Sequence, residues 1–177
     1  MSAAGLIDLR ERFLRLKDLA DRALERLGEE DFFRSLDWES NSPALVVKHV
    51  AGHLRSRWTD FLTSDGDKPD RQRDREFQRE PADSRASLME AWEAGWAALF
   101  TALDALGPTD LNRQVTIRGE PHSVAAALHR GLGHQAYHVG QIVLLAKHYR
   151  LDSWSSLSIP RGSSEEYSKE IRDKFDG

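Results

Sequence analysis

The sequence predicts an all-α protein built as a bundle of four long helices. In four stretches of the 177-residue chain, apolar residues recur at steps of three and four, the period of an α-helix with one buried face. Residues that typically begin and end helices, such as Ser42-Pro43 and Gly107-Pro108, stand at the boundaries of these stretches. A dense run of mixed charges at residues 63–83 predicts a long loop between the second helix and the third.

The first helix is predicted over residues 6–27, where charged residues separate the apolar ones. Its buried stripe is Leu6, Leu9, Phe13, Leu16, Ala20, Ala23 and Leu27. Gly28 is expected to cap its C-terminus. Residues 29–41 are polar and irregular, and four apolar side chains in them are expected to anchor this segment to the bundle: Phe32, Phe33, Leu36 and Trp38.

The second helix is predicted to begin with Ser42 as part of an N-cap and Pro43 in the first turn, and to run to about Leu62. Its core stripe is Val46, Val50, Leu54, Trp58 and Phe61. His49 and His53 lie one turn apart on its first half, and His49 lies close to the apolar edge.

The loop at residues 63–83 carries both charge signs and two prolines, so it is expected to be solvated rather than buried. The third helix follows, with Asp83 or Ser84 as its cap and its end near Leu106. Leu88, Trp92, Leu99, Leu103 and Leu106 are expected to face the core.

Residues 111–122 alternate around Val115 and Ile117 and break at Gly119, which predicts a short two-stranded flap. Ser123 then caps a fourth helix that extends to about Tyr149. In the C-terminal tail, residues 151–177, a cluster of Trp154, Leu157 and Ile159 is expected to dock on the bundle. The last dozen residues are left open between helical, disordered and intersubunit roles.

Composition excludes several classes of protein. The 25 Lys and Arg against 29 Asp and Glu give a net charge of -4, which provides no reason to expect a nucleic-acid partner. Cysteine is absent, so disulfides, thiolate ligands and a cysteine nucleophile are excluded. No apolar run has the length of a membrane span, and the N-terminus reaches charged residues too early for a signal-peptide core. We expect one cytoplasmic domain over residues 1–177.

The histidines carry the strongest chemical signal. His134 and His138 stand four residues apart in RGLGHQAYHVGQIVLLAK, so both imidazoles lie on one helix face and can reach one metal ion. His49 is the best third ligand, while His53 is open as a fourth ligand, a hydrogen-bonding partner behind the ligands or a proton shuttle. The competing reading is that such a pair arises by chance and these are ordinary core or surface histidines.

The remaining glycines and polar residues say less about function than the histidines do. Gly131, Gly133 and Gly140 each need a packing reason inside a helix, and close approach of a neighbouring helix would supply one. Gln135 and Gln141 are expected to face water. The sequence assigns no catalytic residue, because the nearest candidates for a general base, Glu90 and Glu93, are expected in solvent.

Two segments, VVKHVAGHLRSRWTDFL and GLGHQAYHVGQIVLLAK, resemble the DinB/YfiT-like superfamily of four-helix metal-binding proteins. The segments RSRWTDFLTSDG and WSSLSIPRGSSEEY are similar to a bacterial branch of that superfamily without a settled function. The resemblance implies an up-down bundle with a long crossover loop, a homodimer, and a divalent metal held by His49, His134 and His138 with water completing the coordination.

Two classes of function remain open. In the first, as in thiol-transferase members of the superfamily, the protein is a metal-dependent S-transferase or hydrolase that acts on a small molecule. The expected metal ion is zinc or nickel before iron or manganese, and the expected cofactor is a low-molecular-weight thiol. Arg55, Arg57 and Trp58 could then flank a pocket, although the arginines could equally face solvent. In the second class, the protein is a metal-binding or stress-associated module without turnover. An open cleft beside three histidines favours the enzyme, and a closed shell that includes His53 favours the module.

Overall fold

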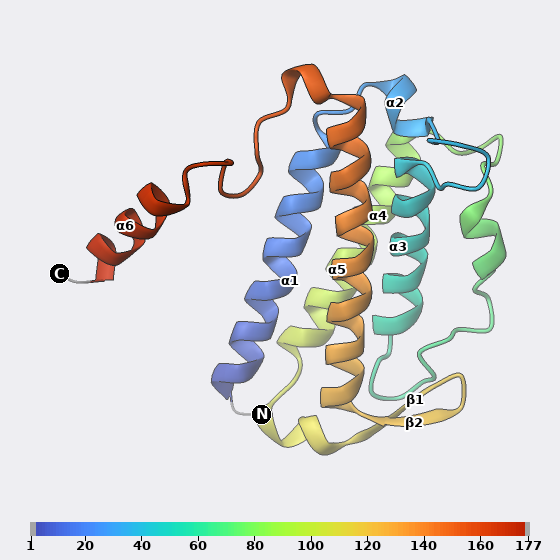
Figure 1. Ribbon diagram of the computed structural model, residues 1–177. Helices are drawn as coiled ribbons and strands as arrows, with labels where there is room; N and C mark the ends of the chain where they lie inside the picture. The colour runs from blue at the N-terminus through green and yellow to red at the C-terminus, as the bar shows by residue number, and fades with distance from the viewer. Residues whose placement is uncertain (1–2, 176–177) are drawn as a thin grey trace.

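The computed structural model describes residues 3–175 and is mostly helical, with one small sheet. Four long helices lie side by side: α1 (Ala3–Leu24), α3 (Pro43–Trp58), α4 (Arg85–Asp104) and α5 (Val124–Tyr149) (Figure 1). Helix α3 packs against α4 and α5, and α1 packs against α5 and α4. The shorter elements are α2 (Glu29–Phe33), η1 (Arg73–Phe77), η2 (Pro108–Asn112), β1 (Gln114–Ile117), β2 (Glu120–Ser123), η3 (Leu151–Ser153) and α6 (Ser164–Phe175).

The apolar stripes of the long helices form one core between them. Its largest fully buried side chains include Phe13 of α1, Trp58 of α3, and Trp92 and Trp96 of α4. Each such side chain contributes about 1.5–3 kcal/mol through the apolar area that it removes from water. The predicted stripes are therefore confirmed in the main, although Leu16 and Leu106 are only partly buried.

Serine caps begin three of the long helices, as predicted. The side chains of Ser42, Ser84 and Ser123 accept hydrogen bonds from the backbone N–H groups three residues further on. The predicted C-terminal boundaries are less accurate. Helix α3 ends at Trp58 instead of Leu62, because Thr59 is extended and Asp60 has a φ of 48°.

Residues 25–41 differ from the expectation in two ways. Helix α1 ends at Leu24, and Gly28 is the N-cap of α2 rather than the cap of α1. Phe32 is buried, but Leu36 and Trp38 are not anchors, since Trp38 is 93% exposed. The reason is local: the carboxylate of Asp37 accepts from two backbone N–H groups and forms a polar turn that holds Trp38 outward.

The loop at residues 63–83 is not simply solvated, which corrects the prediction. Its segment η1 lies against α3, and the side chains of Arg71 and Glu76 are buried there. Burial is tolerated because the two form a bidentate ion pair. At the other end of the loop, Ser56 of α3 donates to the carbonyl of Gly66 and accepts from the N–H of Lys68.

The predicted two-stranded flap is confirmed, with β1 and β2 antiparallel and Val115 opposite His122. Arg118 and Gly119 form the turn, both with positive φ. The carboxylate of Asp65 accepts hydrogen bonds from both of their N–H groups at 2.8 Å, so the 63–83 loop holds the tip of the flap in place.

After α5, Trp154 and Leu157 pack against the core as expected, but Ile159 is 41% exposed and does not. Of the alternatives left open for the last dozen residues, the helical one holds for α6, which extends away from the four long helices (Figure 1). Among the described helices, we find none with the length and hydropathy needed to cross a bilayer.

Candidate metal centre

The structure brings together the three histidines singled out in the sequence. His49 on α3 and His134 and His138 on α5 each offer one ring nitrogen, and these atoms lie within 4.8 Å of one another. The Nε2 atoms of His49 and His134 are 3.3 Å apart. Two nitrogens bound at about 2.0–2.1 Å to a tetrahedral zinc ion lie roughly 3.3–3.4 Å apart, so this pair has the spacing of metal ligands.

Burial keeps the α5 histidines in the protonation state that a metal needs. It is the largest cause lowering the pKa of His134 to about 3, and the neighbouring histidines and arginines lower it further. Burial likewise lowers the pKa of His138 to about 4, against the hydrogen bond that its Nδ1–H donates to Gln141, which raises the pKa. Both rings are therefore neutral at pH 7 and present a lone pair.

Two of the three rings are oriented by a hydrogen bond at the nitrogen that faces away from the centre. The Nδ1–H of His49 donates to Glu76 at 2.8 Å, and the Nδ1–H of His138 donates to the side-chain oxygen of Gln141 at 3.0 Å. Both interactions fix the tautomer that leaves Nε2 free to bind an ion. By contrast, Nδ1 of His134 is buried without a hydrogen-bond partner.

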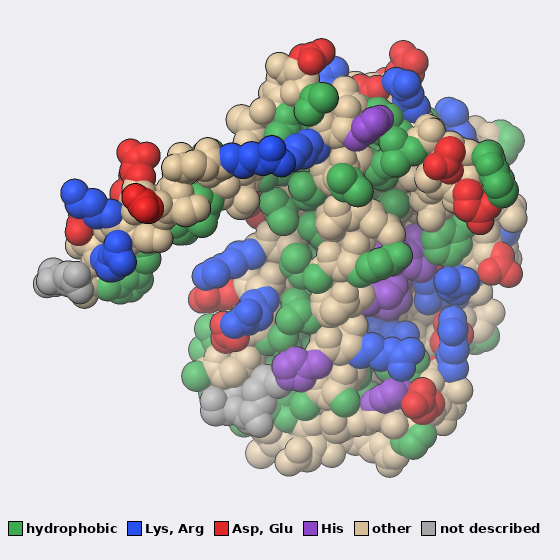
Figure 2. Space-filling view, in the orientation of Figure 1, with side chains coloured by type: hydrophobic (Ala, Val, Ile, Leu, Met, Phe, Trp, Pro, Cys, Tyr) green, Lys and Arg blue, Asp and Glu red, His purple; other side chains and the backbone are tan. Residues whose placement is uncertain are grey.

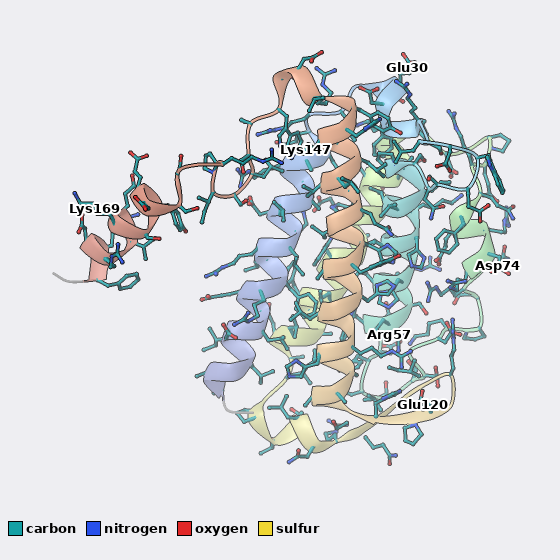
Figure 3. All side chains as sticks on the ribbon, in the orientation of Figure 1. Glu30, Arg57, Asp74, Glu120, Lys147 and Lys169 are labelled. Atoms are coloured by element: carbon teal, nitrogen blue, oxygen red, sulfur yellow. The ribbon has the colours of Figure 1, made fainter. Side chains whose placement is uncertain are left out.

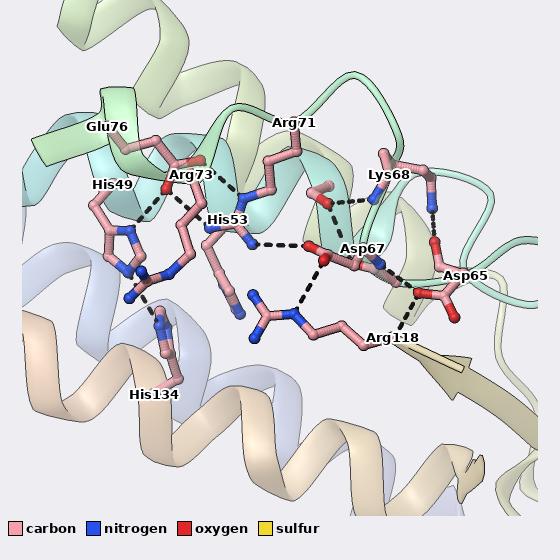
Figure 4. Close-up of polar contacts among 12 residues, drawn as sticks. His49, His53, Asp65, Asp67, Lys68, Arg71, Arg73, Glu76, Arg118 and His134 are labelled. Carbon is pink, nitrogen blue, oxygen red and sulfur yellow. Dashed lines mark hydrogen bonds and ion pairs between the residues drawn. The ribbon is translucent and has the colours of Figure 1, made fainter. Parts of the chain in front are cut away.

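Glu76 connects His49 to a buried arginine (Figure 4). The guanidinium of Arg71 donates to both carboxylate oxygens of Glu76, at 2.8 and 2.9 Å. Burial by itself would raise the pKa of Glu76, but the hydrogen bonds from His49 and Arg71 lower it overall. The carboxylate therefore stays charged and acts on His49 as in the carboxylate–histidine pairs of known metal sites. Phe77, next in the chain, stacks on the His49 ring at 4.5 Å between centroids.

Glu76 can reach His49 only because residue 52 is glycine. A Cβ built on Gly52 would lie 2.8 Å from Cδ of Glu76 and closer still to Oε1, so any side chain there would displace the carboxylate. The sequence reasoning missed both residues. Two signals could have found them: Phe77 is the one large apolar residue among the charges of the loop, and Gly52 stands in the interior of a helix.

His53 lies beside the centre rather than in it. Its ring stacks on that of His134, with centroids 3.7 Å apart, and its Nδ1 is 3.2 Å from the side-chain nitrogen of Gln135. Burial lowers the pKa of His53 well below the usual value. Gln135 is fully buried instead of facing water, because it meets His53 between α3 and α5.

A cavity of about 440 Å³ opens over the centre and is lined by His49, His53, His134 and His138. Arg57 lies in its wall, whereas Arg55 is exposed and pairs with Asp70. Trp58 belongs to the core.

Of the three helical glycines, only Gly131 has the expected packing reason. A Cβ there would lie 2.7 Å from the Trp58 ring, whereas Gly133 and Gly140 have open space, so that expectation was wrong for them. Glu90 and Glu93 are exposed, as predicted.

Comparison with known proteins identifies the family without assigning an activity. No curated protein matches the chain. Residues 1–163 match the family described as "Protein of unknown function (DUF1572)". Since the match covers nearly the whole sequence, this chain belongs to the DUF1572 family of proteins of unknown function.

Proposed function

We propose that the chain is a divalent-metal-binding protein of the DinB-like type, with His49, His134 and His138 as ligands, and that it is a metal-dependent enzyme for a small molecule. The observation that supports this is that one ring nitrogen from each of the three histidines lies within 4.8 Å of the other two, beside a cavity. Nitrogen donors of this kind suit zinc or nickel, then iron or manganese. Three protein ligands leave a coordination position for substrate.

The residues around the three histidines have separate roles. Glu76 and Gln141 hold His49 and His138 in the metal-binding tautomer, and Phe77 stacks on the His49 ring. A bound divalent ion would supply Lewis acidity to water or to a small thiol cofactor, the chemistry that hydrolases and thiol-dependent S-transferases use. The Nδ1 of half-buried His134 has no protein hydrogen-bond partner, and an ordered water beside it would satisfy it.

The proposal extends to the architecture. We propose that α1, α3, α4 and α5 form the up-down bundle of the DinB/YfiT-like superfamily, with residues 63–83 as the long crossover. We also propose a homodimer, in line with the resemblance. Helix α6 is free to make such a contact, because it buries no residue within the described chain and exposes Tyr167 and Phe175. Light scattering on the purified protein tests the dimer.

A second candidate is a metal-binding module without turnover, and one observation favours it. Among the described residues that line the cavity there is no Asp or Glu, so no carboxylate can serve as general base. The enzyme proposal then depends on His53 or on the metal alone. The open cavity and the exclusion of His53 from the ligand group favour the enzyme.

Metal content tests the proposal directly. Elemental mass spectrometry should find about one divalent ion per chain in tag-free wild type, and loss of the ion in His49→Ala and His138→Ala. His53→Phe keeps a ring against His134 and should retain the ion. His148→Ala is the matched control, because this exposed histidine lies on α5 outside the group. Equal metal content in all variants would refute the site, and a positive result justifies a screen with small thiols and electrophiles.

A further inference from the structure

The cavity above the histidines is lined, in the described part of the chain, by basic and not by acidic side chains, in a protein of net negative charge. Five arginines line it, and no acidic residue does so among those described. They are Arg57, Arg71, Arg73, Arg118 and Arg130. Figure 2 shows blue side chains directly beside the purple histidines on this face. Low-dielectric walls focus such a field, so the cavity attracts anions.

Most of these charges already have partners. Arg71 pairs with Glu76, Arg118 donates to Asp67 at 3.0 Å, and Arg130 lies 3.8 Å from Glu120. Arg73 lies 3.8 Å from its neighbour Asp74. The hydrogen-bonded pairs hold Arg71 and Arg118 in the walls of the cavity and reduce their capacity to bind a ligand. The contact of Arg130 with Glu120 is longer and exposed, so Arg130 can still bind a ligand.

Arg57 differs from the others because it is buried and unpaired. Its residue exposure is only 7%, and its Nη1 has no hydrogen-bond partner. Within the described chain it has no carboxylate within ion-pair distance. Burial lowers its pKa to about 10, with the charges of Arg130 and Arg71 adding to the effect, so it remains protonated at pH 7. A buried guanidinium without a counter-ion is unfavourable unless a ligand supplies the missing negative charge.

The fold places Arg57 beside the metal centre. Residues 49, 53 and 57 lie on successive turns of α3, so Arg57 continues the line of His49 and His53. Figure 3 labels Arg57 near the end of α3 that faces the flap. A Cβ on Gly66 would lie 3.0 Å from both Cδ and Nη1 of Arg57, so glycine at this position makes room for the arginine. The N–H of Gly66 donates to Thr116 of β1, which fixes this part of the loop.

We propose that Arg57, together with Arg130, forms an oxyanion subsite beside the three histidines, so that the substrate is a small molecule with a carboxylate or phosphate group. The guanidinium fork binds that group through two parallel N–H donors, and another part of the molecule then reaches the metal position. This inference rests on the proposed function for the role of the metal, whereas the anion subsite itself needs only the arginines.

Isothermal titration of zinc-loaded protein with malonate and with inorganic phosphate tests the proposal. We expect wild type to bind at least one of them, and the stronger binder identifies carboxylate or phosphate as the preferred group. Arg57→Met should bind it at least about tenfold more weakly, as expected for loss of a charge-assisted bidentate contact. Arg55→Met is the control, because this arginine lies on the same helix but does not line the cavity and should bind as wild type does.

Zinc content and thermal unfolding are measured on the same samples. Arg57→Met removes an unpaired buried charge, so it should unfold no earlier than wild type, and Arg130→Met, on the exposed side of the cavity, provides a second variant. Unchanged anion binding in Arg57→Met, or no binding of either anion by wild type, overturns the subsite. Protein that takes up no zinc when zinc is supplied but still binds the anion through Arg57 supports the subsite and refutes the metal proposal instead.

Discussion

Replacing Gly52 by alanine should weaken metal binding without touching a ligand. The new Cβ would stand 2.8 Å from Cδ of Glu76, and the carboxylate is the far end of a flexible side chain, so it will move away instead of unfolding the helix. His49 then loses the acceptor of its Nδ1–H. Loss of such a partner typically lowers metal affinity about 10- to 100-fold, which corresponds to roughly 1.4–2.7 kcal/mol.

Stability is measured beside affinity, because the substitution acts on both. Alanine is favoured over glycine inside a helix by up to about 1 kcal/mol, but breaking the buried Glu76–Arg71 ion pair costs up to about 3–5 kcal/mol, so Gly52→Ala should lower the stability of the metal-free protein. Gly140→Ala is the matched control, since its Cβ would meet open space. It should gain helix stability and keep the wild-type zinc affinity.

Zinc affinity is measured by competition with a chromophoric chelator, and stability by urea unfolding of the metal-free proteins. Glu76→Gln should weaken zinc binding by a similar factor. In the double variant Gly52→Ala/Glu76→Gln the two losses should not add, because both remove the same contact. Wild-type affinity in Gly52→Ala would refute the reasoning, and additive losses would show that Gly52 acts by another route.

Three further predictions concern packing and pH. Gly131→Ala places a Cβ 2.7 Å from the Trp58 ring, so urea unfolding should show a loss of about 1–3 kcal/mol, and an unchanged midpoint would contradict the contact. Burial would raise the pKa of Asp65, but backbone hydrogen bonds from the flap and the loop lower it strongly overall, so its contribution to stability is present above about pH 4 and lost as pH falls. Asp65→Asn should therefore flatten the acid limb of the stability curve, and an unaltered limb would argue against this. Because burial depresses the pKa values of His134 and His138, the metal-free protein should lose stability as pH falls below about 6.5. The measurement is the urea midpoint in the presence of EDTA, which should fall over this range. A constant midpoint down to pH 5 would show that the two rings are not buried as neutral groups.

The sequence predicted the features that depend on local periodicity. Four amphipathic stretches, serine caps and a turn-forming break in the flap are encoded within a few residues of where they act, and the structure contains them all. The spacing of His134 and His138 likewise fixes their common face, since one helical turn determines it.

Features that depend on pairing across the chain could not be read in the same way. Glu76 appears in the sequence as one more charge in a polar loop, and only the meeting of η1 with α3 shows that it contacts His49. Arg57 was equally consistent with solvent and with the cavity, because the helical wheel does not show which loop covers that end of α3. The prediction that Trp38 anchors its segment was wrong because hydrophobicity alone predicts burial, whereas the polar turn at Asp37 directs the indole outward.

The separation of the histidines along the chain has a consequence for folding. His49 and His134 are 85 residues apart, so the centre cannot exist until α5 has been synthesised and has docked on α3. Contacts of such long range are slow to form, because closing the long intervening segment costs conformational entropy before the contact repays it. If the proposed function is correct, ion retention is a measure of completed folding: a truncated or stalled chain that lacks α5 still carries His49 and Glu76 but has only one of the three proposed ligands.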